Sequence, residues 1–419
     1  MTGAQELFIA LVVLYLFECV LVLRRDVIVF RSLGFGRFRA IPAGNLPGSP
    51  ERALFFSMPA PPLGGLYLTE QSPISLSPTG ISTRRAEHFG CESEALEPAE
   101  FRSYAKIEQI AADGPALKIN DEIAERLCGP VAARALAAEI DVLRNAPDAA
   151  GRDRLIERAL DARFDIDAAA AKRETTEREA GTLLMLCNAL CVYLFTIVPL
   201  VVWRSGLDGT WAMLLIALAG LWGSIAAEFV RVHRRLDPDA SADRRHRFAI
   251  ICCTPLSAVR AYEWLLRERL AAFHALAVAI VTCEKADAAA LAGAMLRDLE
   301  YPCRRAAAGV AATSIDQCDA SGESELRSRE DENAEADEAA AWLRSRLRDR
   351  VIRLMRRLEL DVAGALAAPL RDDADSVAYC PRCHTQFVRQ VADCAHCPGV
   401  AVRAFENVVT EKEPVEVRS

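Results

Sequence analysis

The sequence predicts a mainly α-helical integral membrane protein that carries a small α+β domain, a helical domain and a metal-binding segment on its cytoplasmic side. Three observations lead to this fold class. Three apolar stretches are long enough to cross a bilayer, short strand-like runs lie between the first two, and four paired cysteines lie near the C-terminus. The 419 residues are 52% hydrophobic with a net charge of −8, which gives no general case for nucleic-acid binding.

The first predicted transmembrane helix covers residues 7–23, in which Glu18 is the one charged residue. This stretch is short for a span but within the usual range. Arg24 and Arg25 follow it directly, whereas a signal peptide carries its positive charge before the apolar run. We therefore expect an uncleaved anchor whose N-terminus lies outside the cell.

The second and third predicted transmembrane helices, residues 182–203 and 211–230, form an antiparallel hairpin because only a short Gly-containing loop separates them. Basic residues flank both outer ends of this hairpin: Lys172, Arg173, Arg178, Arg231, Arg234 and Arg235. The positive-inside rule places those ends in the cytoplasm, in agreement with the first helix. The sequence thus predicts a multi-pass protein of the cell (inner) membrane with most of the chain cytoplasmic. A fourth span at residues 270–283 is the alternative topology, although this run is shorter than a span.

The region between the first span and the hairpin divides into three parts. Residues 24–65 are rich in Pro and Gly and predict an irregular linker near the membrane surface. Residues 66–146 predict a small α+β domain, because short strand-like runs are followed by a helix that begins at Pro130. Residues 147–181 predict a helical connector to the second span. The predicted strands are residues 66–68, 74–81, 104–110 and 116–119.

A run of short strands closed by one C-terminal helix resembles the bacterial pleckstrin-homology-like domain, over residues 66–146. The resemblance implies a membrane-proximal scaffold and brings no catalytic residue. A small unrelated α+β domain is the alternative.

After the hairpin, residues 248–312 predict a cytoplasmic helical domain made of short apolar helices, and residues 313–340 predict a disordered acidic linker. Residues 341–366 then form a basic amphipathic helix. Its apolar stripe consists of Leu343, Leu347, Val351, Leu354 and Leu358. Two interpretations of this helix remain open: the stripe packs on the helical domain, or it lies on an anionic membrane surface.

The C-terminal segment contains the strongest motif of the chain. Cys380, Cys383, Cys394 and Cys397 form the pattern CxxC-x10-CxxC, in which two cysteine pairs supply four thiolates to one tetrahedral ion. We predict structural zinc, with iron as the rarer occupant. His384 and His396 are possible substitute ligands.

This segment resembles the zinc-ribbon superfamily over residues 379–403. The superfamily mediates contacts with proteins or nucleic acid and is seldom catalytic. Phe387 and Val388 are expected to pack beneath the metal, and Gly399 to turn the chain. The whole chain also resembles bacterial membrane proteins that end in such a ribbon, and this resemblance brings no activity with it.

The sequence offers no catalytic residue and no cofactor-binding residue besides the four metal ligands. None of its six histidines lies in HExxH, and neither GxSxG nor a P-loop occurs. The favoured hypothesis is a membrane-anchored scaffold or regulator, not an enzyme, whose cytoplasmic modules and ribbon bind an unknown protein partner beside the lipid bilayer. The alternatives are a membrane enzyme acting on lipid or envelope precursors and a small-solute transporter. No small-molecule substrate can be named.

Overall fold

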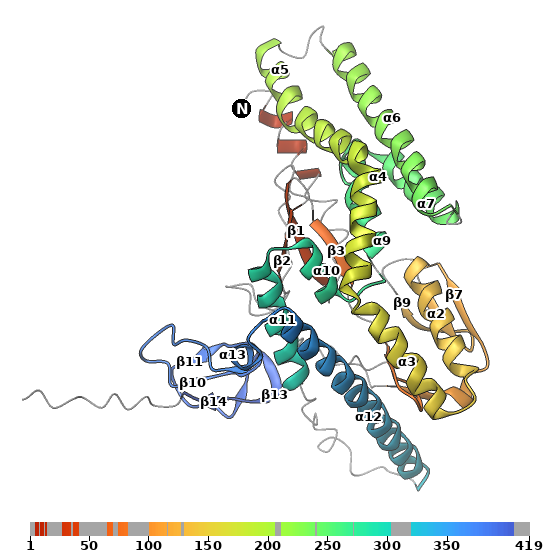
Figure 1. Ribbon diagram of the computed structural model, residues 1–419, viewed down its shortest axis with the longest axis vertical. Helices are drawn as coiled ribbons and strands as arrows, with labels where there is room; N and C mark the ends of the chain where they lie inside the picture. The colour runs from red at the N-terminus through yellow and green to blue at the C-terminus, as the bar shows by residue number, and fades with distance from the viewer. Residues whose placement is uncertain are drawn as a thin grey trace, which may run out of the picture.

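The computed structural model is mostly helical, with two long helices at one end and the four-cysteine segment beside α11 and α13 (Figure 1). The structure describes residues 5–7, 9–11, 13–14, 27–34, 37–41, 65–69, 74–82, 100–114, 116–126, 130–205, 211–238, 241–270, 272–302 and 320–405.

Two helices are long and apolar enough to cross a membrane. The first runs for 40 residues, from Ile166 to Ser205, and the second, α6 (Trp211–Leu236), for 26 residues. They lie side by side in Figure 1 and contain both parts of the predicted hairpin. Of the first predicted span, residues 7, 9–11 and 13–14 are helical, and the remainder lies outside the described residues.

The hairpin buries one face of each helix and exposes the other. Leu183 and Leu190 are buried on the first helix, and Ile225 and Phe229 on α6. Large apolar side chains cover the opposite faces and are exposed: Met185, Val192, Leu200, Trp203, Met213, Leu215 and Ile216. Exposed apolar side chains in this number are typical of a surface that another apolar phase covers.

The 40-residue helix is interrupted by a π-helical turn. It consists of α4 (Ile166–Val192), the π-helical turn η3 (Tyr193–Ile197) and α5 (Val198–Ser205). Pro199 explains the turn, because its ring has no N–H to donate and clashes with the carbonyl four residues earlier. The Tyr193 hydroxyl donates a hydrogen bond to the carbonyl oxygen of Leu214 in α6, at 2.6 Å, which ties the two helices together at this level.

The predicted irregular linker contains a sheet. Strands β1 (Val27–Gly34), β2 (Arg37–Ile41) and β3 (Gly65–Thr69) pair antiparallel in the order β2-β1-β3. The prediction was wrong for residues 27–41 because the Pro-rich composition belongs to the following residues, while β1 itself is rich in β-branched and aromatic side chains. Residues 42–64 lie outside the described residues. Since β3 pairs with β1, a domain boundary at residue 66 divides this sheet.

The small α+β unit contains two further antiparallel sheets and one helix. Strands β4 (Ser75–Leu76), β5 (Gly80–Ser82) and β6 (Phe101–Ser103) form one sheet, and β7 (Ile110–Asp113), β8 (Ala116–Ile119) and β9 (Glu122–Arg126) form the other. Helix α2 (Pro130–Arg144) supplies Leu136, Ile140 and Leu143 to the core they share.

Two local predictions in this unit were wrong. Residues 104–110 do not form one strand, because Tyr104–Lys106 is a 3₁₀ turn (η2) between β6 and β7. The buried Tyr104 hydroxyl explains the turn, since it donates to the carbonyl oxygen of Ser77 at 3.0 Å. Strand β9 was not predicted, because a Glu- and Arg-containing run lacks the apolar alternation of a typical strand.

The predicted connector, residues 147–181, consists of two helices instead of one. Helix α3 (Ala149–Arg163) begins at Asp148, whose carboxylate accepts a hydrogen bond from the Gly151 N–H at 2.6 Å. This helix ends at Phe164. Asp165 then caps α4, because its carboxylate accepts a hydrogen bond from the Ala168 N–H at 2.9 Å. Each Asp satisfies a donor of the first helical turn, so both helix starts are encoded locally.

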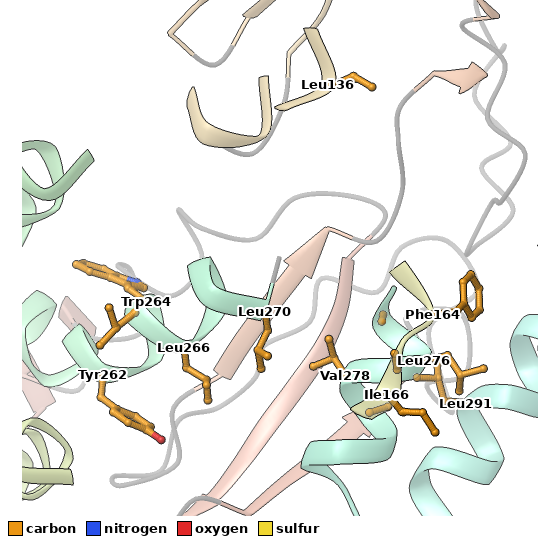
Figure 2. Close-up of a cluster of buried hydrophobic side chains, with 14 of the residues drawn as sticks. Leu136, Phe164, Ile166, Tyr262, Trp264, Leu266, Leu270, Leu276, Val278 and Leu291 are labelled. Carbon is orange, nitrogen blue, oxygen red and sulfur yellow. The ribbon is translucent and has the colours of Figure 1, made fainter. Parts of the chain in front are cut away.

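The predicted helical domain is present. Its helices are α7 (Ser241–Cys253), α8 (Pro255–Val259), α9 (Ala261–Leu270), α10 (Ala275–Thr282) and α11 (Lys285–Glu300). Figure 2 shows how α9, α10 and α11 bring Leu266, Leu270, Val278 and Leu291 into one buried cluster. Residues 303–312 of the prediction lie outside the described residues.

The fourth-span alternative at residues 270–283 does not hold. Helix α10 has only eight residues, and the side chains of Leu276 and Val278 are buried within the protein. His274 precedes the helix, accepts from the Leu276 N–H at 3.3 Å and stacks on Phe164 at 4.1 Å between ring centroids. This histidine is therefore a satisfied core residue, as expected for a His in an apolar run.

Helix α12 (Ala320–Arg357) is longer than predicted and includes most of the supposed acidic linker. Residues 320–340 are helical because Ala, Glu and Arg, all good helix formers, dominate them. Residues 313–319 lie outside the described residues. A short helix, α13 (Val362–Leu366), follows after a turn at Glu359, whose φ is 56°.

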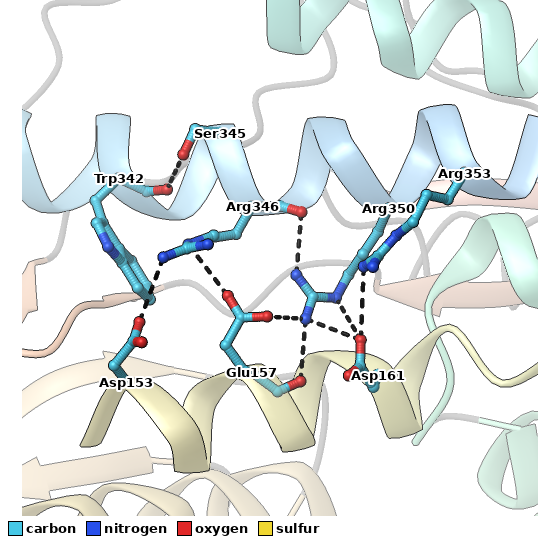
Figure 3. A network of polar contacts seen from close by, with 8 residues as sticks. All are labelled: Asp153, Glu157, Asp161, Trp342, Ser345, Arg346, Arg350 and Arg353. Carbon is cyan, nitrogen blue, oxygen red and sulfur yellow. Dashed lines mark hydrogen bonds and ion pairs between the residues drawn. The ribbon is translucent and has the colours of Figure 1, made fainter. Parts of the chain in front are cut away.

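The apolar stripe of α12 packs on the protein. Leu343, Leu347, Val351 and Leu354 are all less than a tenth exposed, and α12 contacts α3, α11 and the sheet β4-β5-β6. The basic side chains beside the stripe pair with acidic residues of α3, as Figure 3 shows. Arg350 is 3% exposed and donates to Asp161 at 3.1 Å and to the Glu157 carbonyl oxygen at 3.1 Å. The packing interpretation of this helix is therefore correct.

Candidate metal centre

The four predicted ligands lie in two tight turns of the C-terminal segment. Cys380 and Cys383 lie between β10 (Ala378–Tyr379) and β11 (Gln386–Phe387). Cys394 is the last residue of β12 (Asp393–Cys394), and Cys397 is the first residue of β13 (Cys397–Ala401). Strand β14 (Arg403–Ala404) completes a sheet of order β11-β10-β14.

Backbone hydrogen bonds shape the first turn. The Cys380 N–H donates to the Thr385 carbonyl oxygen, and the His384 N–H donates to the Cys380 carbonyl oxygen, both at 2.9 Å. His384 has a φ of 61°, which curls the chain back so that Cys383 faces Cys380.

The four thiols are brought to metal-binding distance. All four Sγ atoms lie within 4.8 Å of one another, and Cys383 Sγ lies 3.7 Å from Cys394 Sγ. Four sulfurs at about 2.3 Å from one tetrahedral ion are separated by about 3.8 Å, so this spacing fits a metal–thiolate centre. Among the described residues, this is the one group of three or more potential ligands close enough to share an ion. His384 and His396 do not belong to it.

The pKa values of Cys380 and Cys383 are lowered, which favours the ionised form of these two thiols. Hydrogen bonds from Cys380, Cys394 and Cys397, and from Thr385, whose hydroxyl lies 3.1 Å from its sulfur, lower the pKa of Cys383. The thiolate is the form that binds a metal. Burial, with Arg297 nearby, lowers the pKa of His384 to about 4, so this imidazole adds no positive charge beside the ligands at neutral pH.

A small apolar cluster supports the thiols from one side. Ala378, Val400 and Val402 are buried with the cysteines, and Phe387 packs against them as predicted. Val388 does not, because it is 67% exposed. Val388 follows the last residue of β11 and lies outside this cluster.

Gly399 takes a φ of 71° within β13, a conformation that glycine adopts without a steric cost. The register of β12 against β13 shifts between the pairs Asp393–Ala401 and Cys394–Cys397, so Gly399 lies in a bulge within the strand, whereas the sequence predicted that it turns the chain.

The ribbon-like segment is docked on the helical domain, which sequence reasoning missed. Arg382, between the first two cysteines, is 3% exposed and forms an ion pair with Asp298 of α11 at 2.8 Å. Its carbonyl oxygen accepts a hydrogen bond from Arg297 at 3.2 Å, and Arg297 also donates to the Ala365 carbonyl oxygen of α13 at 3.1 Å. The turn that holds two ligands thus also holds the contact to α11. An Arg inside a CxxC pair gives no sequence signal for such a contact.

We expect Asp298→Ala to loosen this docking and leave the metal in place. The change leaves the Arg382 guanidinium buried without its carboxylate partner, at a cost of about 3 kcal/mol, or on the order of a hundredfold in amide-exchange protection. Hydrogen exchange of α13 and β10 in the full-length protein measures the effect, and metal analysis measures the content. Arg382→Ala combined with Asp298→Ala should cost less than the sum of the two single changes. Unchanged exchange in Asp298→Ala would show that the ion pair does not hold the segment.

Comparison of the chain with protein-family models, with characterised proteins and with solved structures finds no match.

Proposed function

We propose that this protein is a membrane-anchored scaffold or regulator, which holds a zinc-binding ribbon at a fixed position on the cytoplasmic side so that the ribbon binds a protein partner. The anchor consists of three transmembrane helices in the inner membrane, with the N-terminus outside. The likeness of residues 66–146 to a pleckstrin-homology-like domain belongs to the same proposal, since such domains serve as membrane-proximal scaffolds.

The main support is the continuity of the apolar core. One cluster of buried side chains runs from Val202 in the hairpin through Leu265 in α9 to Leu354 in α12, and includes Leu117 of the α+β unit. Packed interiors transmit position well because they are as dense as organic crystals. The α+β unit and the helices α7 to α12 therefore form one body with the hairpin. The ribbon has a buried cluster of its own and joins this body through the ion pair of Arg382 with Asp298. This arrangement suits a protein that presents the ribbon surface at a fixed position.

The ribbon provides the surface to which the protein partner would bind. His396 and Arg389 are exposed, while Cys380, Cys394 and Cys397 are buried and Cys383 is half-buried. Zinc suits the donor set, because four thiolates at tetrahedral spacing are typical of structural sites, in which the metal leaves no position open for a substrate. The metal would supply rigidity to this surface, and the contacts to a partner would come from the protein side chains.

The proposal predicts that a photo-crosslinking residue at Arg389 or His396 in living cells captures the same discrete protein. The yield should fall strongly when Cys380→Ser removes the metal, because the surface then loses its shape. The same residue placed at Ser345, exposed on α12, serves as the control for random collisions. Crosslinks identical in all three positions, or unaffected by Cys380→Ser, would contradict a partner site on the ribbon.

A further inference from the structure

Helices α7, α8 and α9 contact the hairpin at residues inside its apolar stretches, where a domain that lay wholly in the cytoplasm would make no contact. Both α7 and α8 pack against α6, and α8 and α9 pack against α4 (Figure 1). The Trp222 indole N–H donates to the Ile251 carbonyl oxygen at 2.8 Å, and the Cys187 thiol donates to the Ala258 carbonyl oxygen at 3.4 Å. Trp222 and Cys187 both lie inside the apolar stretches of the hairpin. The turn between α7 and α8 is therefore level with the interior of the two spans.

The part of the hairpin beyond this turn is too short to cross a bilayer by itself. From Cys187 to Ser205 the first helix rises about 27 Å, and from Trp211 to Trp222 α6 rises about 16 Å, at about 1.5 Å per residue. The hydrocarbon core of a bilayer is about 30 Å thick. The membrane must therefore extend past Trp222 toward the cytoplasm, which brings the α7–α8 turn into the cytoplasmic leaflet.

The composition of this turn matches such an environment. Residues 248–259 contain no charge, and basic residues stand directly before them at Arg244, Arg245 and Arg247. Several apolar side chains of the run face outward and are exposed: Phe248, Ala249, Cys252 and Cys253. An exposed apolar tip that begins directly after a basic cluster is typical of a segment whose base lies at the interface.

The polar backbone groups of the turn have hydrogen-bond partners within the protein, as the interior of a membrane requires. A helix end leaves carbonyl groups without partners, and lipid provides none, so non-helical chain at membrane depth needs protein donors. The indole of Trp222 and the thiol of Cys187 supply two such donors to the ends of α7 and α8. At the start of α8, the Thr254 hydroxyl accepts from the Ser257 N–H at 3.0 Å, and Pro255 has no N–H to satisfy.

The first charges after the apolar run are also paired. Arg260 is 2% exposed and forms an ion pair with Glu263 at 3.3 Å. Charged side chains at membrane depth occur in this form, facing the protein interior beside an opposite charge.

We propose that residues 248–259 form a re-entrant segment in the cytoplasmic leaflet, in which lipid acyl chains cover Phe248, Ala249, Cys252 and Cys253. The proposal rests on the membrane location of the hairpin proposed above. It commits to lipid as the partner because α7 and α8 pack directly on α6, whose apolar side chains Leu215 and Ile216 are exposed as well. In the cytoplasmic leaflet, the segment is then a third membrane-embedded element beside the two helices of the hairpin.

The natural thiols of Cys252 and Cys253 provide the test. The full-length protein is placed in lipid nanodiscs, both faces of which are open to water, and treated with a membrane-impermeant maleimide. Peptide mass spectrometry reads the modification at each position. Cys252 and Cys253 should react at least about tenfold more slowly than the cysteine of an Arg245→Cys variant on the same helix, because an apolar surrounding disfavours the reactive thiolate. Since the protein leaves both thiols exposed, slow reaction has to come from lipid.

An Ile216→Cys variant separates this proposal from the membrane assignment, because Ile216 is 72% exposed in the middle of the apolar part of α6. Protection of Ile216→Cys together with fast reaction of Cys252 and Cys253 would overturn the re-entrant segment alone. Fast reaction of all three would overturn the membrane location of the hairpin. Slow reaction of Arg245→Cys would overturn the stated boundary of the segment at Arg247.

Discussion

The Cys380→Ser variant is expected to lose its metal and, with it, the folded C-terminal segment. Strands β10, β11, β12 and β14 have only two residues each, and the apolar cluster around the thiols is small. So little buried surface cannot offset the loss of chain entropy, and the metal has to supply most of the folding free energy, on the order of 10 kcal/mol for a four-ligand zinc site at neutral pH. Three thiolates and a water molecule bind the ion much more weakly.

Metal analysis of the purified full-length protein should give one equivalent of zinc for the natural chain and none for Cys380→Ser. Amide hydrogen exchange should show that β10 and β13 lose their protection. His396→Ala is the matched control, because His396 lies inside the second cysteine pair but is exposed and outside the ligand group. This variant should keep the metal. Full metal retention in Cys380→Ser, or loss in His396→Ala, would show that the four thiols are not the ligand set.

Leu347→Asp and Leu354→Asp are expected to disrupt the packing of α12 against the rest of the protein. Both leucines are 6% exposed, so either change places a carboxylate in an apolar interface without a partner. Such a substitution costs more than about 4 kcal/mol. For a body of this size, the midpoint of thermal unfolding should fall by about 10 °C. The melting of the full-length protein in detergent measures the effect.

Ser345→Asp provides the control for this pair, because it adds the same charge to the same helix at an exposed position. Its melting temperature should be close to that of the natural chain. If instead α12 left the protein and lay on the membrane, Leu347→Asp and Leu354→Asp would release the helix and leave the melting unchanged. Unchanged melting of both variants would therefore refute the packing seen in the structure.

Features that depend on local spacing were predictable from the sequence. The four ligands follow from two CxxC pairs, the hairpin follows from two charge-poor apolar runs, and α2 follows from Pro130 and an apolar stripe. Each of these signals is complete within a few tens of residues. No knowledge of the rest of the chain is needed to read them.

Features that depend on distant partners were not predictable. The sequence left open whether the basic helix packs on protein or on lipid, and acidic side chains of α3 decide it, such as Glu157, nearly two hundred residues away. Arg382 looks like a solvent-exposed residue of a zinc knuckle until Asp298 of α11 stands beside it. The pairing of β1 with β3 spans the Pro-rich residues that predicted a linker. In each case the deciding contact joins segments whose sequences carry no sign of each other.

The π-helical turn in the first long helix keeps the buried side chains before and after it on the same face of that helix. The buried face of this helix also includes Cys191 and Tyr193. Within it, the row of Leu183, Cys187, Leu190 and Leu194 advances by alternating steps of four and three residues, as in a heptad pattern. Continued past Leu194, that pattern selects residue 197, yet Ile197 is 43% exposed, and Val198 and Val202 are buried in its place. One extra residue turns a helix by about 100°, and a π-helical turn absorbs that rotation. The helix thus carries one residue more than its buried stripe requires, and Tyr193–Ile197 is where that surplus residue is accommodated without moving the stripe off its face.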